Sequence, residues 1–102
     1  PDEIGDPHDL AMELRVNGEV RQTSHSGRMS VTIPEILAHY SPLGYSAGDV
    51  LSTGTVSGVA GFSEDAASLY LKPGDVMEAE IERIGVLRNP VVARNRMSRF
   101  PV

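Results

Sequence analysis

Apolar side chains occupy every second position near the start of the chain, at Leu10, Met12, Leu14 and Val16. This period of two predicts a half-buried β-strand over residues 10–16. Asn17-Gly18 follows, and this pair favours a two-residue type I′ turn because both positions need a positive φ. Residues 19–24, "EVRQTS", then predict the returning strand of a β-hairpin.

The hydrophobic period changes to that of a helix further along the chain. The helical spacing i, i+3, i+4, i+7 is filled by Ile33, Ile36, Leu37 and Tyr40. Thr32 and Glu35 fit a capping box at the start, and Ser41-Pro42 ends the pattern. A helix of two turns is too short to be stable alone, so we expect it to pack on a sheet.

Two similar turns, "SAGDV" and "KPGDV", each predict the start of a strand, one from Asp49 to Thr53 and one from Asp75 to Ile81. In and directly after the second strand, Glu78, Glu80 and Glu82 alternate with apolar residues. The stretch "IGVLRNPVV" predicts a last strand, in which Pro90 indicates a sheet edge or a bulge. Between them, "SEDAASLYL" predicts one helical turn with Ser63 as its cap. The tail "ARNRMSRFPV" is basic and aperiodic.

These elements predict one domain of the α+β class, mainly β, with five or six short strands and one or two short helices. The chain has 102 residues and a net charge of −5, so it has no electrostatic reason to bind nucleic acid or an anionic membrane. It has no cysteine, which excludes disulfides, thiolate catalysis and cysteine-based zinc sites. No apolar run is long enough to span a membrane and no signal-peptide pattern is present, so we expect a cytoplasmic protein.

The glycine-rich stretch "LSTGTVSGVAGF", residues 51–62, is the first candidate for chemistry. No lysine follows its glycines as a P-loop requires, and no long helix follows as a dinucleotide-binding loop requires. The hydroxyls of Thr53, Thr55 and Ser57, with free backbone N–H groups, suit a carbonyl or carboxylate ligand. The alternative is a structural connection whose glycines lie at bulges.

Carboxylates and histidines give weaker candidates. Glu78, Glu80 and Glu82 could hold a hard cation on one strand face, but the solvated face of an antiparallel strand has the same pattern, so we do not assign them as a metal site. The sequence has three histidines, His8, His25 and His39, and no pair of them has the spacing of metal ligands.

Four blocks of the chain together resemble the C-terminal part of the fumarylacetoacetate hydrolase family: "LRVNGEVRQ", "IPEILAHYS", "AGDVLSTGTVSGV" and "LKPGDVMEAEIERIGVLRNPVV". The resemblance implies rolled and layered mixed β-sheets, usually in a homodimer. It also implies a divalent cation, Mg²⁺ or else Mn²⁺ or Ca²⁺, that stabilises enolate-like charge on a 2-oxo or diketo acid. Hydrolytic C–C cleavage of an acylpyruvate-like substrate is the leading reaction.

Other reactions remain open within the family, namely those of isomerases, decarboxylases, hydratases and lyases in aromatic or sugar-acid catabolism. A non-catalytic β-rich binding or assembly module is the alternative of another class. The family's metal carboxylates, catalytic lysine and lid lie upstream of the matching blocks. We therefore expect residues 1–102 to be the C-terminal part of one catalytic domain, without catalytic or metal-binding residues of its own, inactive and unstable without the upstream part.

One functional position carries over from the resemblance. Thr55, in "STGTVSG", matches a threonine that the family places against substrate oxygens. Gly54 would let the backbone come close to the substrate, and a ladder of strand hydrogen bonds before it would hold Thr55 in place. The stretch "SHSGRMSVTI", residues 24–33, departs from the family's more polar pattern, so it yields no inference about the substrate.

Overall fold

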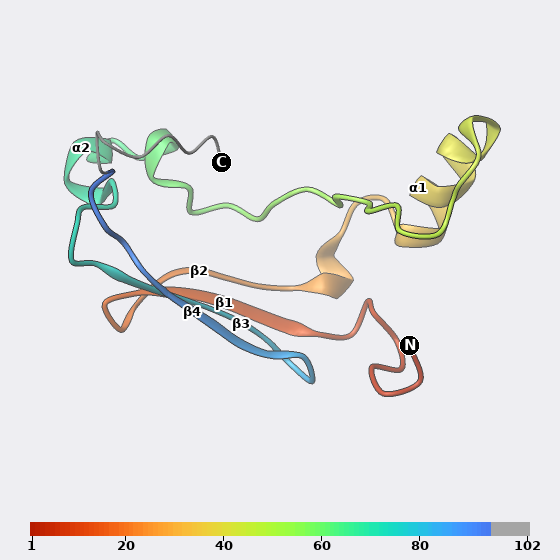
Figure 1. The fold of residues 1–102 in the computed structure, drawn as a ribbon, viewed down its shortest axis with the longest axis horizontal. Helices are drawn as coiled ribbons and strands as arrows, with labels where there is room; N and C mark the ends of the chain where they lie inside the picture. The colour runs from red at the N-terminus through yellow and green to blue at the C-terminus, as the bar shows by residue number, and fades with distance from the viewer. Residues whose placement is uncertain (95–102) are drawn as a thin grey trace.

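A four-stranded antiparallel β-sheet organises the structure, which is a computed structural model that describes residues 1–94 (Figure 1). The strand order is β2-β1-β3-β4. The four strands are β1 (Ala11–Val16), β2 (Glu19–His25), β3 (Val76–Ile81) and β4 (Gly85–Pro90). Two hairpins thus meet side by side, and the chain leaves the sheet after β2 and returns only at β3.

The long excursion between β2 and β3 contains the helices. They are α1 (Ile33–Tyr40) and α2 (Ala66–Leu69), with short 3₁₀ turns at Ser26–Arg28, Ser41–Leu43 and Ala60–Phe62. Figure 1 shows α1 projecting beyond one end of the sheet and α2 near the other end, joined by an extended stretch of chain that runs along the sheet. The excursion therefore passes over the sheet from end to end.

The predicted β1–β2 hairpin is confirmed, and it contains a bulge. Asn17 and Gly18 have φ values of 53° and 80°, as the predicted turn requires. Leu14 pairs with Gln22, whereas the next residue of β1 pairs with Val20, so Arg21 is an extra residue in β2. Such a bulge bends the strand and changes the direction of its side chains.

The two faces of the sheet differ in polarity. Met12 of β1 is paired with Ile81 of β3, and Leu14 is paired with Ala79, which places these apolar residues on one face. The intervening positions carry the charged residues of both strands, which lie on the other face. The predicted alternation of apolar residues and glutamates in β3 is confirmed. Pro90 lies at the end of β4, which pairs with β3 alone among the described strands and is therefore an edge.

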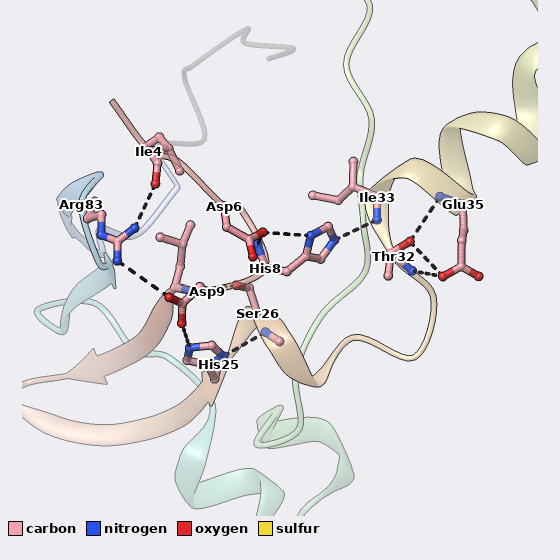
Figure 2. Close-up of polar contacts among 12 residues, drawn as sticks. Ile4, Asp6, His8, Asp9, His25, Ser26, Thr32, Ile33, Glu35 and Arg83 are labelled. Atoms are coloured by element: carbon pink, nitrogen blue, oxygen red, sulfur yellow. Dashed lines mark hydrogen bonds and ion pairs between the residues drawn. The ribbon is translucent and has the colours of Figure 1, made fainter. Parts of the chain in front are cut away.

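Helix α1 begins at the predicted capping box. The Thr32 hydroxyl accepts the N–H of Glu35, and the Glu35 carboxylate accepts the N–H and the hydroxyl of Thr32 (Figure 2). The hydroxyl donation from Thr32 is the main cause of a lowered pKa of Glu35. The N-terminal turn contributes a second contact, because His8 Nε2 accepts the N–H of Ile33 at 3.0 Å.

The structure corrects two expectations about the excursion. Asp49 to Thr53 is not a strand, so residues 1–94 contain four strands rather than five or six, because this stretch has no strand beside it with which to form a ladder. Ser63 does not cap the short helix: α2 begins after Asp65, and the Ser63 hydroxyl accepts the Asp65 N–H at 3.3 Å. Most of the basic tail, residues 95–102, lies outside the described residues.

Little of the described chain is buried. Leu10 and Val16 are the two hydrophobic residues of residues 1–94 that lie below a tenth exposed, whereas Val50 is 93% exposed and Phe62 92%. A compact protein of this mass exposes about 5,600 Å², and this chain exposes 8207 Å². Within residues 1–94, the sheet therefore lacks a cover over much of its apolar surface. No helix within residues 1–94 is long and apolar enough to cross a membrane.

Hydrogen bonds from the side chain of Asn17 join the first hairpin to the turn before β3. The Asn17 amide donates to Asp75 at 2.9 Å, and its oxygen accepts the N–H of Val76 at 2.9 Å. Asp75 also accepts the N–H of Lys72 at 2.8 Å. The bond from Asn17, followed by that from Lys72, lowers the pKa of Asp75.

The lowered pKa of Asp75 predicts a pH dependence of stability. The folded state favours the carboxylate, so the contribution to the free energy of unfolding is complete above the unfolded pKa of about 3.9 and is lost as the pH falls through the lower folded value. In the complete protein, we expect Asp75→Asn to lower the urea midpoint most at pH 6 and progressively less towards pH 3. Urea titrations of both proteins at each pH measure this gap, and a gap that stays constant contradicts the prediction.

Candidate substrate-binding cleft

An open cleft of about 900 Å³ lies over the apolar face of the sheet. Its floor is formed by apolar side chains of the two central strands, Met12, Leu14, Ala79 and Ile81. One wall comes from the chain after β2 and the start of α1, and another from residues 53–57. The cleft is therefore assembled from three parts of the chain that are distant in sequence.

The sequence-predicted residues Thr55 and Gly54 both line this cleft. Gly54 has a φ of 102°, a conformation that strongly favours glycine. A Cβ atom built on Gly54 meets nothing within 4 Å, so the backbone there faces open space. Thr53 and Ser57 also line the cleft, which gathers three hydroxyls and the backbone of a glycine on one wall.

Two contacts with β2 fix this wall, and sequence reasoning missed both of them. The Gln22 side chain donates from Nε2 to the carbonyl oxygen of Val56 at 3.0 Å. Gly58, with a φ of 104°, crosses directly over the strand: a Cβ atom there would lie 2.9 Å from Gln22 Cγ and would collide with the carbonyl oxygen of Arg21. The glycine spacing was the only sequence signal of this crossing.

Three carboxylates of β1 and β3 lie around the side chain of Arg15. Arg15 Nη1 lies 2.9 Å from Glu13 Oε1 and 3.0 Å from Glu80 Oε1, and Arg15 Nε lies 3.9 Å from Glu78 Oε1. The hydrogen bond to Glu13, then that to Glu80, raises the pKa of Arg15. No group of three metal-ligating side chains occurs within residues 1–94. The residues described here thus do not fit the divalent cation that the family implies.

The rings of His8 and His25 accept hydrogen bonds from backbone N–H groups (Figure 2). His25 Nδ1 accepts the N–H of Gly27 at 2.9 Å, and its Nε2 lies 3.2 Å from Asp9 Oδ1. Asp9 in turn lies 3.9 Å from Arg83, which reaches back from the β3–β4 turn. His8 contacts the start of α1, and His39 lies on α1 with its ring edge against Tyr40 at 4.9 Å between centroids.

Comparison with known protein families assigns the chain to a family. Residues 1–92 match the family model described as fumarylacetoacetate (FAA) hydrolase C-terminal. The chain belongs to the fumarylacetoacetate hydrolase family. The resemblance inferred from the four sequence blocks is therefore confirmed.

Similar proteins in the family carry out different reactions. The chain is 41% identical over 92 residues to a 2,4-didehydro-3-deoxy-L-rhamnonate hydrolase of Sphingomonas sp., covering 89% of this chain and 32% of the relative. It is 40% identical to a mitochondrial oxaloacetate tautomerase of Homo sapiens, covering 89% and 29%. Family membership thus establishes a relationship to enzymes that act on acid substrates, and the chain spans about a third of the relatives' length.

Solved structures confirm the fold class. A fumarylacetoacetate hydrolase from Exiguobacterium antarcticum superposes with a TM-score of 0.79 at 42% identity, covering 87% of this chain and 32% of that one. The maleylpyruvate hydrolase of Sphingobium sp. SYK-6, in complex with manganese(II) and pyruvate, superposes with a TM-score of 0.75 at 29% identity, covering 89% and 31%. Divalent metal binding therefore occurs in this family.

Two positive-φ glycines, Gly54 in the cleft wall and Gly58 directly after it, allow a matched test. Alanine is strained by about 1–2 kcal/mol at either position because of the backbone conformation, but only at Gly58 does the new methyl group collide with β2. We expect Gly58→Ala to lower the free energy of unfolding by about 1–3 kcal/mol more than Gly54→Ala does. Urea unfolding of both variants of the complete protein measures the difference, and equal losses would show that the crossing is not close.

Proposed function

We propose that residues 1–102 form the C-terminal part of a single metal-dependent catalytic domain that acts on a 2-oxo or diketo acid, with hydrolytic C–C cleavage of an acylpyruvate-like substrate as its reaction. The observation that carries the proposal is the position of the wall at residues 53–57. In a chain of this family, it brings Thr55 and its neighbouring hydroxyls to an open cleft with an apolar floor.

The cleft has the chemistry that such a substrate needs. Thr55 offers a hydroxyl and a backbone N–H to a carboxylate or oxo oxygen, and these donors are suited to a charged acceptor. Gly54 has no side chain between its backbone and the open cleft, so a ligand can approach closely. The methionine, leucine and isoleucine side chains of the floor suit the carbon chain of the acid.

The metal ligands of the proposed enzyme come from outside this chain. The carboxylates on the sheet are held by Arg15, and no ligand group is formed within residues 1–94. The related maleylpyruvate hydrolase holds manganese(II) and pyruvate, which supports a divalent cation and a 2-oxo acid as the ligands of the complete protein. We propose Mg²⁺, with Mn²⁺ or Ca²⁺ as substitutes, bound by residues upstream of the present chain.

The upstream part of the same polypeptide is the proposed cover of the sheet. The chain spans only 32% of its rhamnonate-hydrolase relative, which leaves room for a larger part of the domain before Pro1. The six residues of β4 are all exposed, and Val86 and Leu87 are 51% and 64% exposed. We propose that this edge and the cleft floor pack against the upstream part, in a protein that forms homodimers.

Tautomerisation of an oxo acid is the second candidate reaction. The 40% identity to a human oxaloacetate tautomerase favours it over the remaining reactions of the family. Assays of the complete protein with an acylpyruvate and with the enol form of oxaloacetate distinguish the two, since cleavage gives two smaller acids whereas tautomerisation converts the enol into its keto isomer without breaking a C–C bond. Binding of both acids without turnover would identify a non-catalytic binding module instead.

Thr55→Val tests the role of the hydroxyl. Valine keeps the shape and the backbone N–H but removes the O–H donor. A hydrogen bond to a charged oxygen contributes about 1.5–3 kcal/mol, so we expect kcat/KM to fall about 10- to 150-fold. Thr53→Val, which removes a hydroxyl from the same wall, is the control and should lower kcat/KM far less. Steady-state kinetics that leave Thr55→Val near the wild-type value would exclude the hydroxyl as a substrate ligand.

A further inference from the structure

The wall that carries Thr55 is not part of a strand ladder. Residues 50–58 form no β-strand, and no backbone hydrogen bond within the described residues joins 53–58 to the sheet. The expectation that strand hydrogen bonds hold Thr55 is therefore wrong for this structure. A binding group must stay within about 0.5 Å of its productive position, so another interaction must fix this wall.

Gln22 provides that interaction. Its Nε2 donates to the carbonyl oxygen of Val56, the residue directly after Thr55, at 3.0 Å and in a partly buried position. The bond connects residues that lie 34 positions apart in sequence. It acts on the carbonyl of the residue after the threonine, in the peptide unit between Val56 and Ser57, so it restrains the backbone close to Thr55.

The pairing of Gln22 with Leu14 places the Gln22 side chain on the cleft face of the sheet, and the bulge brings the neighbouring Arg21 to the excursion as well. Consecutive side chains of a regular strand point to opposite faces. Here the extra residue Arg21 donates to the carbonyl oxygen of Leu69 at 3.2 Å while Gln22 donates to Val56, so two consecutive side chains both contact the excursion over the sheet. Gly58 then crosses over the same two residues, which places the wall close to the strand.

We infer that Gln22 is a positioning residue that sets the substrate affinity of the enzyme by holding residues 53–57 in place. The inference rests on the proposed role of Thr55 and adds the residue on which that role depends. Gln22 itself does not contact the substrate in this account: its amide is used by Val56. Loss of the amide donor leaves the wall without its only side-chain hydrogen bond to the sheet among the described residues.

Gln22→Leu in the complete protein tests the inference by kinetics. Loss of one hydrogen bond of ordinary strength corresponds to a factor of about 2 to 12, and we expect KM for the 2-oxo acid to rise by such a factor. A residue needed only for folding would lower the amount of active enzyme, and with it the apparent kcat, at an unchanged KM. An unchanged KM overturns the inference.

Gln22→Glu adds a pH readout and guards against a general folding defect. The side chain keeps its shape, but its carboxylate has no proton to donate to the Val56 carbonyl. Protonation of the carboxyl, with an ordinary pKa of about 4.3 that a facing carbonyl raises, restores the donor. We expect KM of Gln22→Glu, relative to wild type, to recover as the pH falls from 8 to 5, whereas KM of Gln22→Leu should not. Parallel pH profiles of the two variants overturn the inference.

Proteolysis separates failure of this inference from failure of the proposed function. Cleavage of a folded protein follows the population of the locally opened segment, so mass-spectrometric mapping should show cleavage within residues 53–62 about 2- to 12-fold faster in Gln22→Leu. Arg21→Met is the matched control, because it removes the neighbouring tie to Leu69 but leaves the bond to Val56. It should leave cleavage in 53–57 and KM unchanged.

Comparison of Gln22→Leu with Thr55→Val then shows which of the two proposed roles fails. Faster cleavage in Gln22→Leu, together with a Thr55→Val enzyme of normal kcat/KM, would show that Gln22 holds the wall but that the hydroxyl of Thr55 is not the substrate ligand. A damaged Thr55→Val enzyme, together with Gln22→Leu of normal KM and normal cleavage, would overturn the positioning role and leave the proposed function standing.

Discussion

The apolar face shared by β1 and β3 is the constraint on which the rest of the structure depends. Hydrophobic burial is the main favourable term in folding and grows with the apolar area removed from water. In this chain the floor made by Met12, Leu14, Ala79 and Ile81 lies under an open cleft, and only Leu10 and Val16 of the described hydrophobic residues are buried. The sheet is well paired, but it has too little cover.

The same open face explains where chemistry can occur. A ligand cleft needs an apolar surface with a few polar groups placed over it. The excursion after β2 supplies those groups, because it carries the hydroxyls of residues 53–57 across the sheet. Gln22, which pairs with Leu14, and the bulged residue Arg21 connect the two, since both side chains contact the excursion. Stability and function thus both depend on what lies over the apolar face.

Local sequence signals predicted the elements that depend on neighbours in sequence. The period of two, the Asn17-Gly18 turn and the capping box at Thr32 each depend on residues only a few positions apart, and all three are present. The predicted strand from Asp49 to Thr53 is not, because a strand also needs a partner, and none lies beside it in the described residues. A tight turn identifies the partner of a strand within a hairpin, but neither the apolar pattern nor the turn at Asp49 identifies a partner that is distant in sequence.

In the candidate site, too, the sequence predicted some residues but not the contacts between residues that are distant in sequence. Family resemblance pointed to Thr55 and Gly54, and both line the cleft. The bond from Gln22 to Val56 and that from Ile33 to His8 connect residues 34 and 25 positions apart, so no local pattern could show them. The spacing of the β3 glutamates did not show their contacts either: Arg15 binds Glu80 and lies beside Glu78, and it comes from a strand about 65 positions away in sequence.

The central claim is that this chain needs a cover from the rest of its polypeptide, and urea unfolding of residues 1–102 alone, combined with light scattering, tests it most directly. The sheet has an exposed edge at β4 and an open apolar face, so the account predicts a chain that self-associates or unfolds over a broad range of urea without a cooperative transition. A monodisperse monomer with one sharp, cooperative transition would contradict it.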